Sequence, residues 1–360
     1  MLVRSVLFAI ILYINVVSCS PVSFRESASC FPPTRERWTT LADIKLHPRQ
    51  EHSTVTTDPN TIYVIGGIFP SSDGLTTSTV TIVQRYSIPH GTWDSVAHLP
   101  IPLNHPNAAV IDGRIYVIGG LSPDEENIWS AVRKCYVYDP RMNTWGSLPD
   151  IPAGRETGAA AVSVKGTTVY LSGGLSSINP VPGGAENSVG TVSSVDVVSW
   201  KWKSLFDLPL PRDHAASALI DSTIFVIGGR AFGHNNVVDT VFALDLSSKS
   251  QEWTAHRARM PTARGGVASA VVNGKIIVFG GEGNPATGLG VNGTGIFDQT
   301  EAYNPKEDTW ETLEPMLHPR HGTSAISIGR KVYIPGGGHI EGVAPVSTFD
   351  YFEERNSLEL

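Results

Sequence analysis

The chain has 360 residues, of which 17% are charged, and its formal net charge is −7 at pH 7. This negative balance, without any run of lysines and arginines, argues against a nucleic-acid-binding function. Thirty-five glycines and 25 prolines indicate a chain with many tight turns.

The first twenty residues have the pattern of a secretory signal peptide. Arg4 precedes the apolar stretch VLFAIILYINVV, and the small residues Ser18-Cys19-Ser20 follow it. The apolar core is short for a bilayer span and no second span follows, although an uncleaved anchor is the alternative. The string VVSC also resembles a bacterial lipoprotein cleavage box. We expect a signal peptide at 1–20, a tail at 21–37 and a secreted or luminal protein without a membrane span.

From residue 38 onwards the chain repeats one pattern six times. Gly-Gly doublets recur every 52 to 56 residues, and a tryptophan precedes each doublet. This spacing is typical of a four-stranded unit and not of a helical repeat. The doublets are Gly66-Gly67, Gly119-Gly120, Gly173-Gly174, Gly228-Gly229, Gly280-Gly281 and Gly336-Gly337, and the tryptophans are Trp38, Trp93, Trp145, Trp202, Trp253 and Trp310.

Each unit predicts a four-stranded antiparallel sheet. The doublet ends a short apolar run such as IYVIGG at 62–67, which is typical of a strand buried on both faces. A small-residue strand and a tight turn, for example Asp112-Gly113, precede the run and form a hairpin with it. After a longer loop comes a strand with a tyrosine seven positions before the tryptophan, as in YVYDPRMNTW at 136–145. The doublet glycines would let a neighbouring backbone approach closely.

This combination of doublet, tyrosine and tryptophan resembles the kelch repeat over residues 38–352. The resemblance implies an all-β fold, a six-bladed kelch-type β-propeller with a four-stranded sheet in each blade. Trp38 comes before any doublet, and the last doublet is followed by one further strand near Phe349. We therefore expect the N-terminal segment WTTLADI to close the last blade, and a short tail at 353–360.

The connections between the second and third strands of each blade are long and differ between blades, whereas the other hairpins are tight. They include IFPSSDGLTTST from 68, LSSINPVPGGAENSVG from 175 and EGNPATGLGVNGTGIFDQ from 282. Long variable loops on a rigid ring are the usual carriers of binding. We expect function on the face that bears these loops and the start of each innermost strand.

Five of the six blades have an arginine at the start of the innermost strand, and the second blade has Leu103 there. Sixfold geometry would aim these arginines at the channel mouth, as multidentate donors for an anionic or oxygen-rich ligand. Kelch adaptors that bind acidic peptides use arginines similarly placed, so the resemblance implies the same. The structural alternative is that each arginine binds carbonyl groups of a neighbouring loop. The predicted ring comprises Arg49, Arg155, Arg212, Arg264 and Arg320.

Histidines at the same mouth are candidate catalysts. His214 and His321 follow ring arginines within two residues and could act as general acid and base near neutral pH. Asn104, His105 and Trp129 complete the predicted ligand-binding set, Trp129 because it lies outside the repeat. Histidines that only bind surface loops are the alternative.

Cys30 and Cys135 remain after signal cleavage, and an oxidising compartment would allow them to form a disulfide, although the tail would have to reach across a blade. Asn292-Gly293-Thr294 is a glycosylation sequon in a long loop. HExxH, CxxC and phosphate-binding glycine motifs do not occur, so we expect neither a metal nor a cofactor.

Two functions are compatible with these features. A secreted, stand-alone kelch chain of this length is similar to the sialic acid mutarotases. This resemblance implies a cofactor-independent isomerase or cyclase, in a secondary-metabolite pathway for instance, that acts on a small molecule at the channel mouth. The alternative is a non-enzymatic module that binds a glycan, a peptide or a protein through the same face. The propeller is neutral between them. We expect a monomer and favour the small-molecule enzyme, since no adaptor domain accompanies the propeller.

Overall fold

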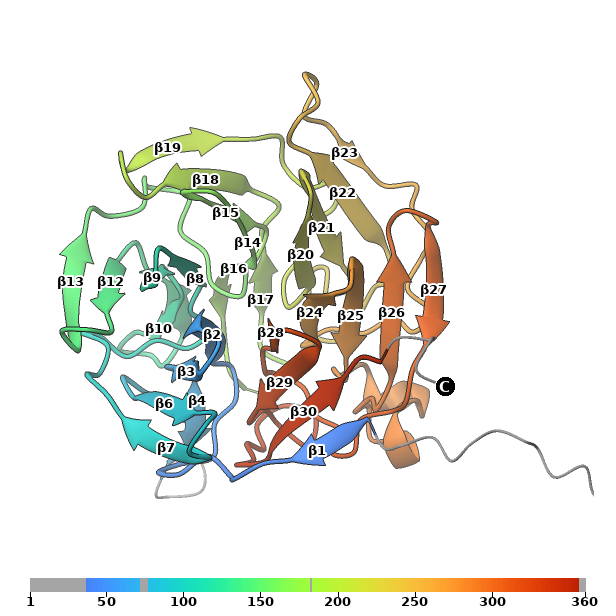
Figure 1. Ribbon diagram of the computed structural model, residues 1–360. Coiled ribbons are helices and arrows are strands. Elements are labelled where there is room, and N and C mark those ends of the chain that lie inside the picture. The colour runs from blue at the N-terminus through green and yellow to red at the C-terminus, as the bar shows by residue number, and fades with distance from the viewer. Residues whose placement is uncertain (1–36, 72–76, 182, 356–360) are drawn as a thin grey trace, which may run out of the picture. The chain divides into compact units, whose positions relative to one another are not determined.

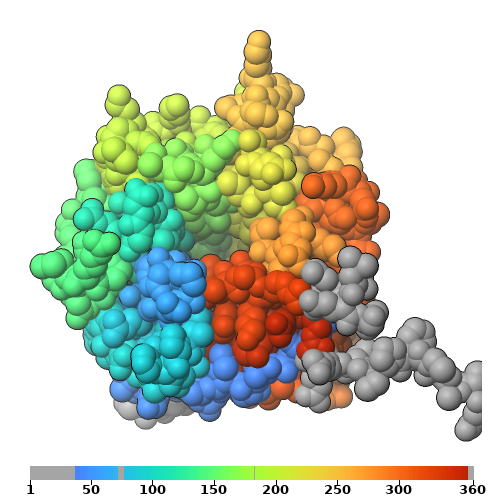
Figure 2. Space-filling model, viewed as in Figure 1, coloured from blue at the N-terminus to red at the C-terminus, as the bar shows by residue number. Residues whose placement is uncertain are grey.

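The computed structural model describes residues 37–71, 77–181 and 183–355. These residues form an all-β structure without an α-helix, in which six four-stranded antiparallel sheets surround a centre (Figure 1). The face in view is hollowed at that centre (Figure 2). The predicted signal peptide and residues 21–36 of the predicted tail lie outside the described residues. In the described part of the chain, no helix has the length and apolar character needed to cross a membrane.

Each of the six blades consists of four neighbouring strands, which are named from the innermost to the outermost. Blade one contains β2 (Ser53–Asp58), β3 (Thr61–Ile65), β6 (Val83–Ser87) and β7 (Thr92–Ser95). Blade two contains β8 (Ala108–Ile111), β9 (Arg114–Ile118), β12 (Cys135–Asp139) and β13 (Thr144–Leu148). Blade three contains β14 (Ala161–Lys165), β15 (Thr168–Ser172), β18 (Val192–Asp196) and β19 (Lys201–Ser204).

The second half of the ring repeats this order. Blade four contains β20 (Ala216–Ile220), β21 (Thr223–Ile227), β22 (Val241–Asp245) and β23 (Trp253–Thr254). Blade five contains β24 (Ala268–Val272), β25 (Lys275–Phe279), β26 (Thr300–Asn304) and β27 (Thr309–Thr312). Blade six contains β28 (Ile326–Ile328), β29 (Lys331–Pro335), β30 (Phe349–Glu353) and β1 (Trp38–Thr40).

The ring closes through the N-terminal strand, as the sequence predicts. β1 pairs with β30, so that Trp38 lies opposite Phe352 and Thr40 opposite Asp350. The innermost strands contact one another in the order β2, β8, β14, β20, β24, β28, and β28 contacts β2 in turn. The predicted six-bladed propeller, closed by its N-terminal strand, is confirmed.

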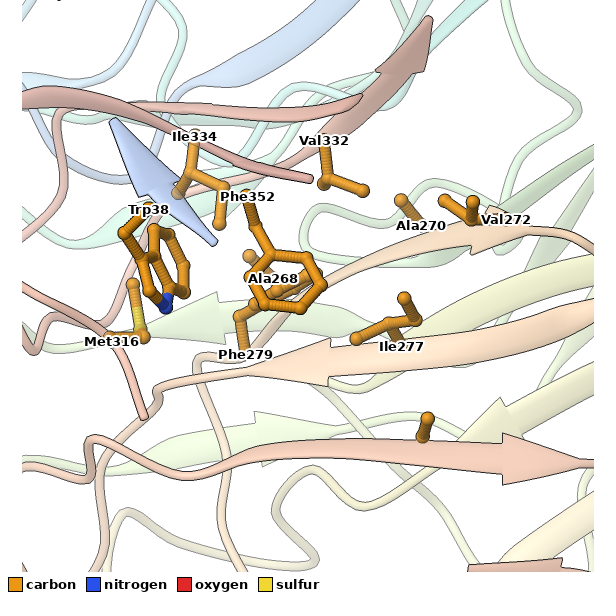
Figure 3. Packing of buried hydrophobic residues seen from close by; sticks show 11 residues of the cluster. Trp38, Ala268, Ala270, Val272, Ile277, Phe279, Met316, Val332, Ile334 and Phe352 are labelled. Atoms are coloured by element: carbon orange, nitrogen blue, oxygen red, sulfur yellow. The ribbon is translucent and has the colours of Figure 1, made fainter. Parts of the chain in front are cut away.

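The continuous apolar runs are explained by packing on both faces of a blade. In β25, Ile277 and Phe279 pack against blade six, whereas Ile276 and Val278 pack against blade four. Between blades five and six the Trp38 ring meets Phe279 edge-on, with ring centroids 5.8 Å apart (Figure 3). A strand between two sheets has no solvent-facing side, so it lacks polar alternation.

The Gly-Gly doublets are positions where one blade touches the start of the next. At Gly280, φ is +55° and an added Cβ would lie 2.3 Å from the carbonyl oxygen of Arg320. The neighbouring Gly281 N–H donates to that same oxygen at 3.0 Å. The close backbone approach predicted from the sequence is therefore present, and it leaves no space for a side chain.

The repeated tryptophans tie each blade to the preceding one. The Trp145 indole donates to the carbonyl of Ala97 at 2.8 Å, and Tyr138 packs on the same indole. In blade three, Trp202 has the expected register opposite Val195, but Trp200 makes the bond to the preceding blade, at 3.0 Å from the Pro149 oxygen. The tyrosine–tryptophan pattern is therefore structural.

The long loops carry additional short elements on one face of the ring. They are β4 (Ile68–Pro70), β5 (Thr77–Thr79), β10 (Leu121–Pro123), β11 (Trp129–Ala131), β16 (Leu175–Ile178), β17 (Glu186–Ser188) and the 3-10 turns η1 (Pro285–Thr287) and η2 (Val291–Gly293). Strands β10, β11, β16 and β17 form one further sheet from the loops of blades two and three. These loops build the walls of a cavity at the ring centre.

Candidate functional site

The chain enters each blade through one residue with a left-handed backbone, and these six residues form a belt at the ring centre. They are Glu51, His105, Ala159, His214, Gly266 and Gly322, with φ between 48° and 62°. Five backbone hydrogen bonds link successive members, running from Glu51 to Gly322, His105 to Glu51, Ala159 to His105, Gly266 to His214 and Gly322 to Gly266. A left-handed backbone suits glycine, so the side chains in blades one, two and four are held there at a conformational cost.

The three functional side chains of this belt, Glu51, His105 and His214, meet at one point. His105 Nε2 lies 3.0 Å from Glu51 Oε2 and 2.9 Å from His214 Nε2. His214 Nε2 lies 3.6 Å from the same Glu51 oxygen. We call these three residues the floor cluster.

Each floor histidine is oriented from behind by an oxygen acceptor. His105 Nδ1 lies 2.6 Å from Asn104 Oδ1, and His214 Nδ1 lies 2.6 Å from Asp213 Oδ1. Because these partners accept hydrogen bonds, both imidazoles donate through Nδ1 and direct Nε2 at the meeting point. Asn104 and Asp213 therefore set the tautomer and the orientation of the two rings.

The floor cluster is a strongly polarised environment. Burial lowers the pKa of His105. Burial would also lower the pKa of His214, but its hydrogen bonds to Asp213 and Glu51 outweigh this and raise it to about 10. Burial would raise the pKa of Glu51, yet the two histidines hold it well below its usual value. The floor cluster therefore favours a positive charge at the point where Glu51 Oε2, His105 Nε2 and His214 Nε2 meet.

A second group of charged residues, which we call the wall network, stands beside the floor cluster. The Arg230 guanidinium binds Glu282 and lies 3.3 Å from Glu186 Oε1. Burial would raise the pKa of Glu282, but the charges of His321 and Arg230 lower it to about 2. The backbone bridges Asp213↔Arg230 and Gly265↔Glu282 fix the two charged residues just after their doublets.

The wall network ends at a histidine that reaches solvent. His234 Nδ1 lies 3.1 Å from Glu186 Oε1, and His234 Nε2 lies 2.5 Å from Glu341 Oε1. About a third of the His234 and Glu341 side chains is exposed, at 29% and 31%. This pair is accessible to a molecule that enters the site.

Floor cluster and wall network line one cavity of about 470 Å³. Its other half is apolar, because Trp129 packs there with Ile68, Leu121 and Leu175 from blades one to three. Four glutamates but a single arginine are among the lining residues. The lining therefore favours a cation or a neutral, oxygen-rich ligand over an anion.

The arginines predicted at the channel mouth are instead buried within the blades. Each binds a backbone carbonyl of its own blade, for example Arg264 to Gly280 at 2.7 Å and Arg212 to Gly228 at 3.0 Å. None lines the cavity, and each is at most 1% exposed; the set comprises Arg49, Arg212, Arg264 and Arg320. For these four arginines the expected ring at the channel mouth is wrong, and the alternative, in which they bind backbone carbonyls, is confirmed.

Arg155 does not share their position. The Gly120 N–H donates to the Thr157 carbonyl as the Gly281 N–H does to Arg320, so Thr157 is the equivalent in blade three. Arg155 lies two residues earlier and is partly exposed. Arg155 was assigned to the arginine position wrongly, because the segment that precedes blade three differs in length from the equivalent segments of other blades.

The other predicted residues divide between cavity and support. His214, His105 and Trp129 line the cavity. Asn104 lies behind His105, and His321 lies behind the wall, with Nδ1 3.0 Å from Glu282 Oε1. Asn292 is exposed in η2, and its glycosylation stays a prediction. Cys135 is buried and its partner Cys30 lies outside the described residues, so the disulfide also stays a prediction.

Sequence reasoning missed Glu51 and most of the wall network. A signal was present, because aligning the units on the arginine position places Glu51, His105 and His214 two residues after it, where blades five and six have glycine. Arg230 and Glu282 similarly follow their doublets directly. Among the residues that the structure describes, two sets of three ligand-type residues have their candidate metal-binding atoms within 4.8 Å of one another: the floor cluster, and His234 with Glu282 and Glu341.

Comparisons with known proteins agree with the repeat. A family model described as the KLHDC2/KLHL20/DRC7 Kelch-repeats domain matches residues 150–337, and one described as the Kelch motif matches residues 102–152. Kelch-like protein terF of Aspergillus terreus is 41% identical over 325 residues, which cover 89% of this chain and 69% of that protein.

More distant relatives share less. Kelch-like protein 41a of Danio rerio is 29% identical over 244 residues, or 66% of this chain and only 36% of that protein. A solved structure described as "Structure of YjhT" superimposes with a TM-score of 0.70 at 17% identity, over 88% of this chain and 98% of that one. At this identity the superposition shows a shared fold.

Proposed function

This chain belongs to the kelch-repeat family, and because a shared propeller does not determine an activity, we propose a function from its own cavity: an enzyme of the isomerase or cyclase kind that acts on a small, oxygen-rich molecule. The observation that carries the proposal is one cavity in which the floor cluster faces the wall network. Its volume, about 470 Å³, lies within the range of small-molecule sites, roughly 300–1,000 Å³.

The buried charges support catalysis over a purely structural role. Arg230, Glu186 and Glu282 have side chains at most 3% exposed, and removing such groups from water costs several kcal/mol for each ion. The packing between blades does not require Arg230 and Glu282, because the corresponding positions in blades one to three hold Ile68, Leu121 and Leu175. Charges kept at this cost beside a cavity are typical of functional sites.

The two groups suggest a division of roles. The positive centre of the floor cluster would polarise a carbonyl or hydroxyl oxygen of the bound molecule. The accessible His234–Glu341 pair would move a proton, removing it from one atom of the substrate and returning it to another. Such a reaction changes neither composition nor oxidation state, as an isomerisation or cyclisation requires. Trp129 and the apolar half of the cavity would hold the carbon skeleton.

Solvent exchange tests this proposal without knowledge of the substrate. The protein is incubated in deuterated water with a panel of neutral sugars and cyclic ketones, and proton NMR follows deuterium incorporation and isomer exchange. We expect turnover of at least one compound, and His234→Ala to slow it by about 10²–10⁴-fold. His256→Ala, an exposed histidine away from the cavity, is the matched control and should keep the rate.

Other outcomes would reject the proposal. Binding of panel compounds without any turnover would favour the alternative, a module that binds a glycan, peptide or protein. Equal rates for the wild type and His234→Ala would remove the wall network from the chemistry.

The localisation belongs to the same proposal. Secretion through residues 1–20 would place the enzyme in an oxidising compartment, with a glycan on exposed Asn292. N-terminal sequencing of the mature protein and a mass shift on deglycosylation test both points. A mature protein that starts at Met1 would contradict cleavage.

A further inference from the structure

We infer that the floor cluster, Glu51, His105 and His214, binds one divalent transition-metal ion. The sequence contains neither HExxH nor CxxC and so predicts no metal, whereas these three residues are 54 and 109 positions apart and form no local motif. The ring geometry brings them together from blades one, two and four.

The distances between the ligand atoms fit a shared ion. The two Nε2 atoms and Glu51 Oε2 are separated by 2.9, 3.0 and 3.6 Å. Ligands bonded to one zinc-like ion at about 2.0–2.2 Å lie about 3.3–3.6 Å apart in tetrahedral geometry and about 2.8–3.1 Å apart at neighbouring octahedral positions. Two imidazoles and one carboxylate are a ligand set that zinc and non-haem iron both use.

The outer contacts support the same assignment. Asp213 and Asn104 each take the Nδ1–H of one histidine, both at 2.6 Å, so both Nε2 atoms point at one position. Two Nε2 atoms and a carboxylate oxygen directed at one point require a positive charge between them, which a metal ion supplies in place of the proton on His214. An imidazole whose other nitrogen donates to a carboxylate is the usual arrangement around a metal.

The backbone shows that the fold alone does not require these residues. Glu51, His105 and His214 have φ of 55°, 48° and 51°, values that glycine adopts without strain, and blades five and six have glycine at the same belt position. Three blades thus hold large ligand-type side chains where the backbone favours none. This is a cost to stability that metal binding explains.

The surroundings suit a catalytic ion. The cavity lining carries four glutamates against one arginine, so a dipositive ion improves its charge balance. The three ligands come from the belt side, which leaves coordination positions directed into the cavity for water or a substrate oxygen. The second candidate set is weaker, since Glu282 already pairs with Arg230 and His321.

Metal binding can be measured on the protein alone. The full chain is stripped with a chelator and titrated with Co²⁺, followed by its visible spectrum, and with Zn²⁺, followed by thermal stability. We expect one equivalent of metal per chain and a higher Tm with Zn²⁺. The metal content of untreated protein, by mass spectrometry, distinguishes zinc from iron.

Glycine variants separate binding from folding, because glycine is the residue that blades five and six use. His105→Gly and His214→Gly relieve the backbone strain but leave Asn104 or Asp213 without its imidazole, so folding of each variant is checked by its Tm, and both should lose Co²⁺ binding by more than about 100-fold. Asp213→Asn should weaken binding by about 10–100-fold. His234→Ala, from the second candidate set, should keep it.

Three results would overturn the inference. They are no stoichiometric binding by the wild type, equal binding by wild type and His105→Gly, or loss of binding in His234→Ala with retention in His214→Gly. The inference shares the floor cluster with the proposed function, in which that cluster polarises a substrate oxygen, but metal binding and turnover are measured separately. Metal binding without turnover would reject the function and keep the metal site, whereas turnover by stripped protein without binding would do the reverse.

Discussion

The substitution Gly280→Ala tests whether the doublets are required by contact between blades. Gly280 has φ +55°, and an added Cβ would lie 2.3 Å from the Arg320 oxygen and 2.7 Å from Met316 Sδ. Gly274, in the β24–β25 turn of the same blade, has φ +75° and no atom within 4 Å of an added Cβ. Gly274→Ala is therefore a matched control that shares the backbone strain but not the collision.

The expected magnitudes follow from these distances. Both substitutions place an L-residue in the left-handed region, which costs about 1–2 kcal/mol. Gly280→Ala adds overpacking of about 1–3 kcal/mol. It also disturbs the Gly281–Arg320 hydrogen bond, of 3.0 Å, which contributes about 1 kcal/mol. We expect a loss of about 3–6 kcal/mol for Gly280→Ala and about 1–2 kcal/mol for Gly274→Ala.

Equilibrium unfolding in urea, followed by tryptophan fluorescence, measures both values. The dependence of the unfolding free energy on urea should be the same for both variants, because neither changes the surface exposed on unfolding. Equal destabilisation by the two substitutions would refute the reasoning, since it would mean that only the backbone angle matters at the doublet.

Three further predictions concern buried groups. Arg320→Met should cost about 3–5 kcal/mol in unfolding free energy, because it leaves Asp350 buried without the guanidinium that pairs with it. Arg259→Met, from an exposed ion pair, should cost less than about 1 kcal/mol. Equal losses for the two variants in urea unfolding would contradict this difference. The pKa of Glu282 is lowered from 4.5 to about 2, so its contribution to stability is complete above about pH 4.5 and is lost as the pH falls towards 2. The difference in stability between wild type and Glu282→Gln should thus shrink from about pH 6 to about pH 3, and a constant difference would argue against the assigned charge. Burial raises the pKa of the Cys135 thiol to about 12, so a thiol reagent at about pH 8 should not label it in the native protein. In concentrated guanidinium chloride, labelling of Cys135 would show a free thiol, whereas no labelling would show the predicted bridge to Cys30.

The sequence predicted the blades because each repeat is short and self-contained. Apolar runs, hairpin turns and tyrosine–tryptophan pairs such as Tyr138 and Trp145 act within one blade or between neighbouring blades. Six aligned copies reinforce each other, so weak local signals gave the blade number and the closing strand. The division into a tight face and a loop face followed from loop length alone.

The same repetition misled the interpretation of the arginines. An arginine that recurs at the same position in four of the six blades has, in this chain, a structural role that those blades share. Arg264 binds the Gly280 carbonyl and Glu301 inside blade five and does not line the cavity. Departures from the repeat were the better guide to the site, since Glu51, His105 and His214 stand where glycine would suffice.

By itself the sequence determined the fold class, the number of blades, the ring closure and the face that bears the long loops, because these depend on patterns within about fifty residues of chain. Only the tertiary structure decided which side chains share the cavity. Glu51 and His214 are 163 positions apart and meet because ring closure brings blades one and four to a common centre. The spacing of residues along the chain does not predict this contact. It also decided that the arginines are buried, since their direction depends on how neighbouring blades pack.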